Sequence, residues 1–207
     1  MPFIFANVPH LRKHGPNGYK RYQSYKGWLR DEFTFRCVYC LERERWYPNG
    51  HGGFGVDHVR PKGQAEYAHL ICNYSNLVYA CNRCNTAKNG SILIDPCDVA
   101  FADHLRVDDN GEITGLTVEG WRVINILGLD LRLPTNERKM KLRILDLYRR
   151  YPYDDTLQAL YSDAFGFPED LPNLAIHSRG KNTKPEGISQ SYYRQRETGT
   201  LPPTYGL

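Results

Sequence analysis

Apolar residues recur at three- and four-residue steps near the start of the chain, at Tyr22, Tyr25, Trp28, Leu29 and Phe33. This spacing predicts an amphipathic helix between residues 19 and 35. Two short apolar runs follow, at residues 55–59 and 76–81, and each is bounded by polar, Gly- or Pro-containing segments. They predict two strands joined by a loop. A short helix is expected from Asn85, with its break near Asn89 and Gly90.

The second half of the chain predicts a hairpin followed by helices. Asp108-Asp109-Asn110-Gly111 is a strong turn sequence between residues 105–107 and 113–116. Thr117 can cap a helix that runs to about residue 127 and stops at Gly128. A longer helix is expected over residues 134–148, with its apolar side chains turned inward: Met140, Ile144, Leu145 and Leu147. One more helix is expected from Asp154 or Asp155 to Phe165.

These elements suggest an α+β protein with four segments. Residues 1–18 are expected to form an irregular arm, 19–97 a compact core, 98–166 a hairpin and helical extension, and 167–207 an extended tail. The tail is rich in Pro, Gly, Ser, Thr and charge, so we expect order there only if it docks on another part of the protein.

The net charge of the 207-residue chain is +4, which is compatible with a nucleic-acid partner but does not require one. Basic residues outnumber acidic ones between Arg12 and Arg45, and Tyr19, Tyr22, Tyr25 and Trp28 are interleaved with them. This stretch suits phosphate contacts supported by ring packing. It suits equally well a solvated basic face over an aromatic core, and both interpretations stay open.

The amino-terminal sequence lacks the apolar segment of a signal peptide, and no stretch approaches the ~20 apolar residues of a membrane span. We therefore expect a cytoplasmic protein without a membrane partner. In that setting six cysteines favour metal binding over disulfides.

Four of the cysteines form two Cys-x-x-Cys pairs, Cys37 with Cys40 and Cys81 with Cys84. Four thiolates predict a tetrahedral, structural Zn²⁺ site. A redox dithiol and an iron–sulfur cluster are the alternatives. Cys72 and Cys97 fall outside this pattern, and we expect them to be small buried residues.

Between the two cysteine pairs and directly after the second lie residues suited to phosphodiester chemistry. Asp57 and the amide oxygen of Asn85 are ligands that a hard divalent cation prefers. A neutral imidazole at His58 can take a proton from water. Lys88, one helical turn after Asn85, can meet a phosphate. Taken singly, each of these residues has an ordinary structural explanation such as a cap or a helix start.

The combined order Cys-x-x-Cys, Asp-His-x-x-Pro, Asn-Leu and Cys-x-x-Cys-Asn-x-x-Lys resembles the HNH endonuclease family in its zinc-stapled form. The resemblance covers roughly residues 33–96. It implies a ββα-metal (His-Me finger) nuclease core with a structural zinc site and flanking helices. It also implies that His58 is the general base, that Asp57 and Asn85 hold the catalytic ion, and that Asn76 pins the loop that orients His58.

An oxygen ligand at Asn85, where many family members have His, favours Mg²⁺ or Mn²⁺. The resemblance further implies cleavage of DNA, most naturally double-stranded, to 5′-phosphate and 3′-hydroxyl ends. Backbone contacts would come from Arg60, Lys62 and Lys88. A weaker similarity of residues 98–151 to extensions of stand-alone bacterial HNH proteins suggests anti-phage defence and a partner ATPase. The alternatives are an RNA-targeting or toxin-like nuclease and a non-catalytic, zinc-stapled nucleic-acid-binding module.

Overall fold

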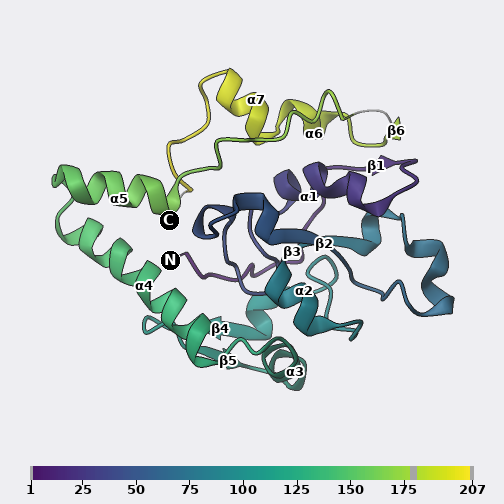
Figure 1. Cartoon of the computed structure of the whole chain (residues 1–207), viewed down its shortest axis with the longest axis horizontal. Coiled ribbons are helices and arrows are strands. Elements are labelled where there is room, and N and C mark those ends of the chain that lie inside the picture. Colours follow the sequence, from purple (N-terminus) through teal and green to yellow (C-terminus); the bar gives the residue numbers. More distant parts are fainter. Residues whose placement is uncertain (1, 178–180, 206–207) are drawn as a thin grey trace. The chain divides into compact units, whose positions relative to one another are not determined.

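The computed structural model describes residues 2–177 and 181–205 (Figure 1). Its α-helices are α1 (Lys26–Glu32), α2 (Asn82–Lys88), α3 (Val118–Leu127), α4 (Arg132–Arg150), α5 (Asp155–Phe165), α6 (Glu186–Ser189) and α7 (Tyr192–Glu197). Its strands are β1 (Pro16–Asn17), β2 (Phe54–His58), β3 (Leu77–Cys81), β4 (Leu105–Val107), β5 (Ile113–Gly115) and β6 (Lys181–Asn182). Short 3₁₀ helices lie between them: η1 (Tyr22–Tyr25), η2 (Glu44–Trp46), η3 (Gly50–Gly53), η4 (Ala65–Leu70), η5 (Tyr74–Asn76) and η6 (Phe101–Asp103).

The described residues fall into two compact units. The cysteine unit comprises residues 11–92, 168–177 and 181–201, and the hairpin unit comprises residues 2–10, 93–167 and 202–205. Each unit draws on residues from both ends of the chain. The four segments expected from the sequence stay a prediction.

The centre of the cysteine unit is a ββα arrangement. Strands β2 and β3 pair antiparallel, with Asp57 opposite Val78 and His58 opposite Leu77, and α2 follows β3 directly. All five residues of β3 are buried, and the rings of Phe54 and Tyr79 stack across the pair with their centroids 5.1 Å apart. Both predicted strands and the short helix after them are confirmed.

Helix α1 is shorter than its apolar spacing predicted, because the segment is divided into η1 and α1. The helix ends where Thr34 and Phe35 adopt left-handed backbone angles, each with φ of 55°. Its last three residues are charged and yet buried. Arg30 makes two hydrogen bonds to Glu44, at 2.9 and 2.8 Å, and neutralisation of this kind is what allows charge inside a core.

The carboxyl-terminal segment, for which order was expected only if it docks, contacts α1. The backbone amide of Tyr192 donates to Asp31 at 2.8 Å, and Arg30 pairs with Asp170 at 2.9 Å. Strand β6 pairs with β1, and α6 and α7 follow it. Polar anchors add to the few buried aliphatic side chains of this segment, Leu171 and Leu174, which is why its low apolar content did not predict its order.

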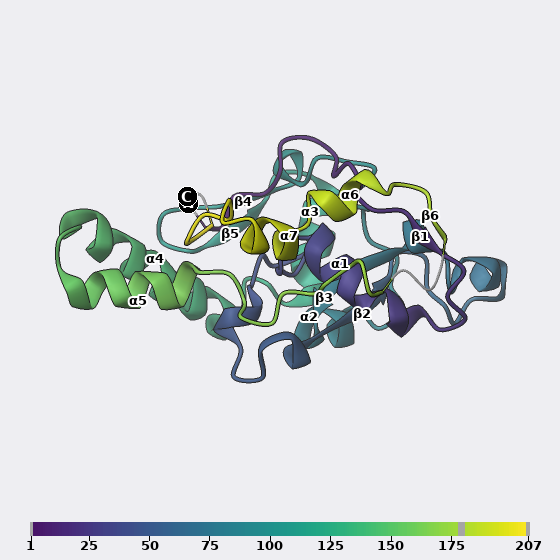
Figure 2. The same cartoon turned by 90° about the horizontal axis from the view of Figure 1, so that it is seen from above.

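The hairpin unit contains the predicted β4–β5 hairpin followed by three helices. The Thr117 hydroxyl caps α3 by accepting from the Gly120 amide at 3.1 Å, and Gly128 ends the helix with φ of 60°. Arg138 of α4 is buried and donates to the carbonyl oxygens of Gly111 and Leu129, at 2.6 and 2.9 Å. These contacts fix α4 to the turn of the hairpin. Helices α4 and α5 pack side by side (Figures 1 and 2).

One prediction for α4 is wrong in part. Leu145 is buried, but Met140 and Leu147, which were expected to point inward, are 59% and 41% exposed. Ile144 is half-buried. The core takes the face of Pro134, Arg138, Leu142 and Leu145 instead.

Candidate metal sites and catalytic residues

The two Cys-x-x-Cys pairs meet at one point of the cysteine unit. The sulfur atoms of Cys37, Cys40, Cys81 and Cys84 all lie within 4.8 Å of one another, and all four residues are buried. The sulfurs of Cys40 and Cys81 are 3.7 Å apart, close to the separation of ~3.8 Å that tetrahedral Zn–S bonds of ~2.3 Å require. The donor set and its spacing therefore fit a structural zinc ion.

Local structure delivers each pair to this cluster. The first pair lies in a turn closed by a bridge between Arg36 and Arg43 and by a hydrogen bond from the Cys37 amide to the Glu42 carbonyl at 2.8 Å. The second pair spans the start of α2, where the Cys81 sulfur caps the helix by accepting from the Cys84 amide at 3.5 Å. Cys72 and Cys97 lie outside the cluster, and both are half-exposed rather than buried as expected.

Asp57 lies near the end of β2 with its carboxylate almost enclosed. Its Oδ2 atom accepts from the Tyr39 hydroxyl at 2.7 Å. Its Oδ1 atom accepts from the His58 amide at 2.8 Å and lies 3.4 Å from the Lys88 ammonium group. A carboxylate offers about four lone-pair positions, so three protein donors leave one for a cation.

His58 ends β2 and is only 5% exposed. Its Nε2 atom lies 3.0 Å from the carbonyl oxygen of Ile71, and a carbonyl oxygen can only accept. Nε2 therefore carries the hydrogen, and Nδ1 of the neutral ring keeps a lone pair. Burial lowers the pKa of His58 below its usual value, which favours this neutral form, although the Ile71 carbonyl and Asp57 act in the opposite direction.

Asn85 reaches β2 from the first turn of α2. Its side-chain nitrogen donates to the carbonyl oxygen of Val56 at 3.5 Å, next to Asp57 in the sequence. This orientation leaves the amide oxygen as the atom that can bind a cation. Asp57 and Asn85 thus supply two oxygen ligands of the kind that Mg²⁺ and Mn²⁺ prefer, from neighbouring elements.

Asn76 ties together the loop between the two strands. Its side-chain oxygen accepts from the Arg60 amide at 2.7 Å, and its nitrogen donates to the carbonyls of Arg60 and Leu70 at 3.1 and 3.3 Å. Leu70 directly precedes Ile71, whose carbonyl holds the His58 ring. Asn76 therefore fixes the segment that orients His58.

The three predicted phosphate contacts occupy different environments. Lys62 is exposed and Arg60 is half-buried. Lys88, in contrast, is 2% exposed, and its ammonium group donates to the His58 carbonyl at 2.7 Å. The amine of Lys88 therefore points inward, toward the strand that ends in His58, and its contact with a phosphate stays a prediction from the sequence.

Two aromatic residues belong to the site although sequence reasoning gave them no such role. Tyr39 binds the Asp57 carboxylate, as described above, from within the first Cys-x-x-Cys turn. Tyr22 packs edge-on against the His58 ring with centroids 4.7 Å apart, and its hydroxyl accepts from Lys62 at 2.8 Å. The position of Tyr39 between two metal-ligand candidates was a usable clue, whereas the approach of Tyr22 to His58 has no counterpart in the sequence pattern.

The basic stretch between Arg12 and Arg45 was interpreted either as a phosphate-binding surface or as a basic face over an aromatic core. Each interpretation fits a part of it. Arg30 and Arg43 are buried, as are Tyr25 and Trp28, so part of the stretch is core. Lys20 and Arg21 are exposed next to Tyr22 in the sequence. These cations, together with Lys13, which is also exposed, are available to a ligand.

The fold and the site together define a class of protein: a ββα unit that combines a four-cysteine cluster with an Asp-His pair at the end of a strand. Residues 37–91 match the family model of the HNH endonucleases, so this part of the chain is an HNH endonuclease domain. No curated protein matches the chain significantly.

The described residues form an α+β structure. The match to the HNH endonucleases suggests a metal-dependent nuclease and nucleic-acid binding. The cysteine cluster is a possible zinc site of the same domain. No helix within the described ranges is both long and apolar enough to cross a bilayer.

Proposed function

We propose that this protein hydrolyses phosphodiester bonds of DNA, with His58 as the general base and Asp57 and Asn85 as ligands of Mg²⁺ or Mn²⁺. The observation that supports this most strongly is the hydrogen bond from His58 Nε2 to the Ile71 carbonyl. It fixes both the tautomer and the orientation of the ring, leaving Nδ1 to accept a proton from an attacking water.

The surroundings of His58 hold the ring ready for that step. Tyr22 packs on one side of it, and Asn76 holds the loop that provides the Ile71 carbonyl. The lowered pKa keeps the imidazole neutral near pH 7, so it can act as a base without first losing a proton. After the proton transfer, the positive charge on the ring lies next to the Asp57 carboxylate, which stabilises it.

Asp57 and Asn85 form the proposed site for the divalent ion. One lone-pair position remains on the Asp57 carboxylate after its three protein contacts, and the Asn85 oxygen is turned away from its own hydrogen bond. A divalent ion bound there would supply Lewis-acid stabilisation of negative charge on the phosphate oxygens. The residues' own contribution is to orient their oxygens.

We assign the phosphate contacts to Lys62 and Arg60, which flank the end of β2 and reach the surface. Cations of this kind bind nucleic acid through its backbone, independently of sequence. The zinc ion proposed for the four cysteines has a structural role, because all four thiols are buried away from this surface.

The proposal is tested by incubating zinc-loaded protein with supercoiled plasmid, single-stranded DNA and total RNA, each with Mg²⁺, Mn²⁺ or no added divalent ion. We expect nicking of the plasmid that requires one of the two ions and is lost in His58→Ala. His69→Ala is the matched control, since His69 is exposed on η4 in the same loop. Degradation of RNA with intact plasmid would assign the site to an RNA-targeting nuclease instead.

A role in bacterial anti-phage defence, a partner ATPase and a cytoplasmic location stay predictions from the sequence. Expression of the native operon followed by purification tests the ATPase partner. A chain that purifies alone and cuts unaided would count against it.

A further inference from the structure

Helix α4 has a buried apolar face and an exposed one, and its Tyr148 stacks on Tyr161 of α5 with ring centroids 3.9 Å apart. The buried face contacts the hairpin through Arg138, Leu142 and Leu145. The other face is an exposed stripe in which Leu133, Met140 and Leu147 recur every seven residues and Tyr151 lies four residues after Leu147. Their exposed fractions are 64%, 59%, 41% and 58%, and Ile144 lies half-buried among them.

The seven-residue recurrence is the spacing by which one helix packs along another. A helix needs a single apolar stripe to join its own core, so a second one has no role in the packing described above. Met140 at its middle is suited to a contact surface, because methionine adapts its shape to a partner. Exposed apolar residues gathered in this way mark interaction sites.

A row of cations borders the stripe on one side. Arg132, Lys139, Arg143 and Arg150 lie on one flank of α4, and among them Asp146 pairs with Arg150 at 3.0 Å. Helix α4 holds seven basic residues and two acidic ones, a net charge of +5, although the whole chain is only +4. The charge of the protein is therefore concentrated on this helix.

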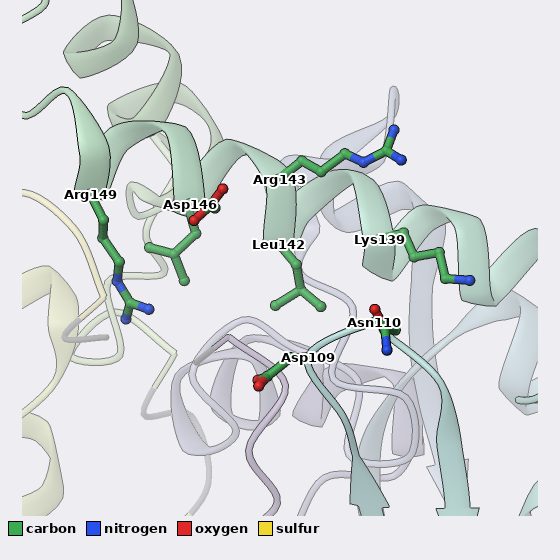
Figure 3. A pocket seen from close by; sticks show the side chains of 8 residues that line it. Asp109, Asn110, Lys139, Leu142, Arg143, Asp146 and Arg149 are labelled. Carbon is green, nitrogen blue, oxygen red and sulfur yellow. The ribbon is translucent and has the colours of Figure 1, made fainter.

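A hollow of about 590 Å³ lies between the turn of the hairpin and the basic side of α4. It is lined by the side chains Asp109, Asn110, Lys139, Leu142, Arg143, Leu145, Asp146 and Arg149. Leu142 points toward the hairpin turn and Arg143 away from it (Figure 3). Lys139, Arg143 and Arg149 thus lie at the edge of this hollow, together with the acidic side chains Asp109 and Asp146.

We propose that this stripe and its cation row are the docking surface for an acidic, amphipathic helix of a partner protein. The apolar seam of such a helix would cover Leu133, Met140 and Leu147, and its carboxylates would meet the cation row. A second copy of the chain is disfavoured, because two helices of charge +5 repel each other. Duplex DNA could bind the cations, but the apolar seam would add little to its affinity. Binding to a lipid surface does not require apolar residues at seven-residue spacing.

The test uses two synthetic peptides of three heptads each, with leucine at the seam and either glutamate or lysine at the remaining positions. Binding to the full-length protein is measured by fluorescence anisotropy. Met140→Lys/Leu147→Lys removes the seam without loss of helix propensity. Lys139→Glu/Arg143→Glu removes the cation row, and Val118→Lys is the control, as Val118 is an exposed apolar residue of α3.

We expect the acidic peptide to bind with a Kd on the order of micromolar. Both double substitutions should weaken it by about tenfold or more, while Val118→Lys leaves it unchanged. Several results would overturn the proposal: equal binding of the acidic and basic peptides, or a seam variant that binds like the wild type. The proposal would also be overturned if the wild type bound duplex DNA or anionic vesicles but neither peptide, and the seam variant lost that binding. A wild-type dimer in sedimentation that is absent in the seam variant would overturn it as well.

Discussion

The ammonium group of Lys88 lies 2.7 Å from the carbonyl oxygen of His58, inside the protein. Lys88 is 2% exposed, and its ammonium group also lies 3.4 Å from Oδ1 of Asp57. It therefore binds the end of β2 inside the protein and does not reach the surface. This placement predicts that Lys88 acts on the geometry of the site rather than on the capture of the substrate.

Replacement of Lys88 by Met keeps the aliphatic stem and removes the charge. We expect the rate of DNA cleavage to fall by about tenfold or more, because Asp57 and His58 lose a shared anchor. The unfolding temperature should also fall, since Asp57 keeps a buried charge without its cation. The Kd for DNA, measured without a divalent ion, should change by less than about twofold; a large loss of affinity would show that Lys88 contacts the backbone after all.

Lys62→Met should have the opposite profile. Lys62 is exposed at the mouth of the site, so its loss should weaken DNA binding for all sequences and reduce the salt dependence of binding by about one ion. The unfolding temperature should stay the same, because the contact to Tyr22 is a surface one. An unchanged salt slope in anisotropy titrations would remove Lys62 from the interface.

Tyr22 provides a test of how the His58 ring is held. Tyr22→Ala removes the edge-on ring contact, which is worth about 0.5–1.5 kcal/mol, and should lower the cleavage rate by about three- to tenfold. Tyr22→Phe keeps the ring and loses only the hydrogen bond to Lys62, so its rate should stay close to that of the wild type. Equal losses in both variants would assign the effect to the hydroxyl group.

The cysteine cluster predicts one bound zinc ion and a fold that depends on it. Cys81→Ser should lower the zinc content measured by mass spectrometry and destabilise the cysteine unit severely, because apparent binding energies of structural zinc are about 10–16 kcal/mol. Cys72→Ser is the control and should keep full zinc content, since Cys72 lies outside the cluster. Activity that survives complete zinc removal at full rate would contradict a structural role.

The parts of the site that sequence reasoning found are those encoded by spacing. Two Cys-x-x-Cys pairs must lie close together if they bind one ion. Asp57 and His58 come at the end of an apolar run that is long enough for one short strand, so their place at a strand end could be predicted. The same reasoning missed Tyr22 and did not predict the inward direction of the Lys88 amine. The positions of Tyr22 and of the Lys88 amine depend on how the loops pack around the end of β2. The spacing of apolar residues does not predict that packing.

For helix α4 the apolar spacing predicted the helix but not which of its faces is buried. Its sequence predicts a helix because apolar residues recur at helical spacing, and the helix is present. The pattern contains two apolar faces, however, and composition alone did not show which one the hairpin would cover. The buried guanidinium of Arg138 decides it by binding two backbone carbonyls, so Met140 and Leu147 remain at the surface.

The central claim is that His58 takes the proton from the attacking water. Its most direct test is the single-turnover rate of plasmid nicking by His58→Ala and His69→Ala in saturating Mg²⁺ or Mn²⁺, with zinc content and unfolding temperature checked for both. General-base catalysis contributes about 10²–10⁴ in rate, so His58→Ala should be slower by that factor while His69→Ala cuts like the wild type. Cleavage by folded, zinc-loaded His58→Ala at the wild-type rate would contradict the account.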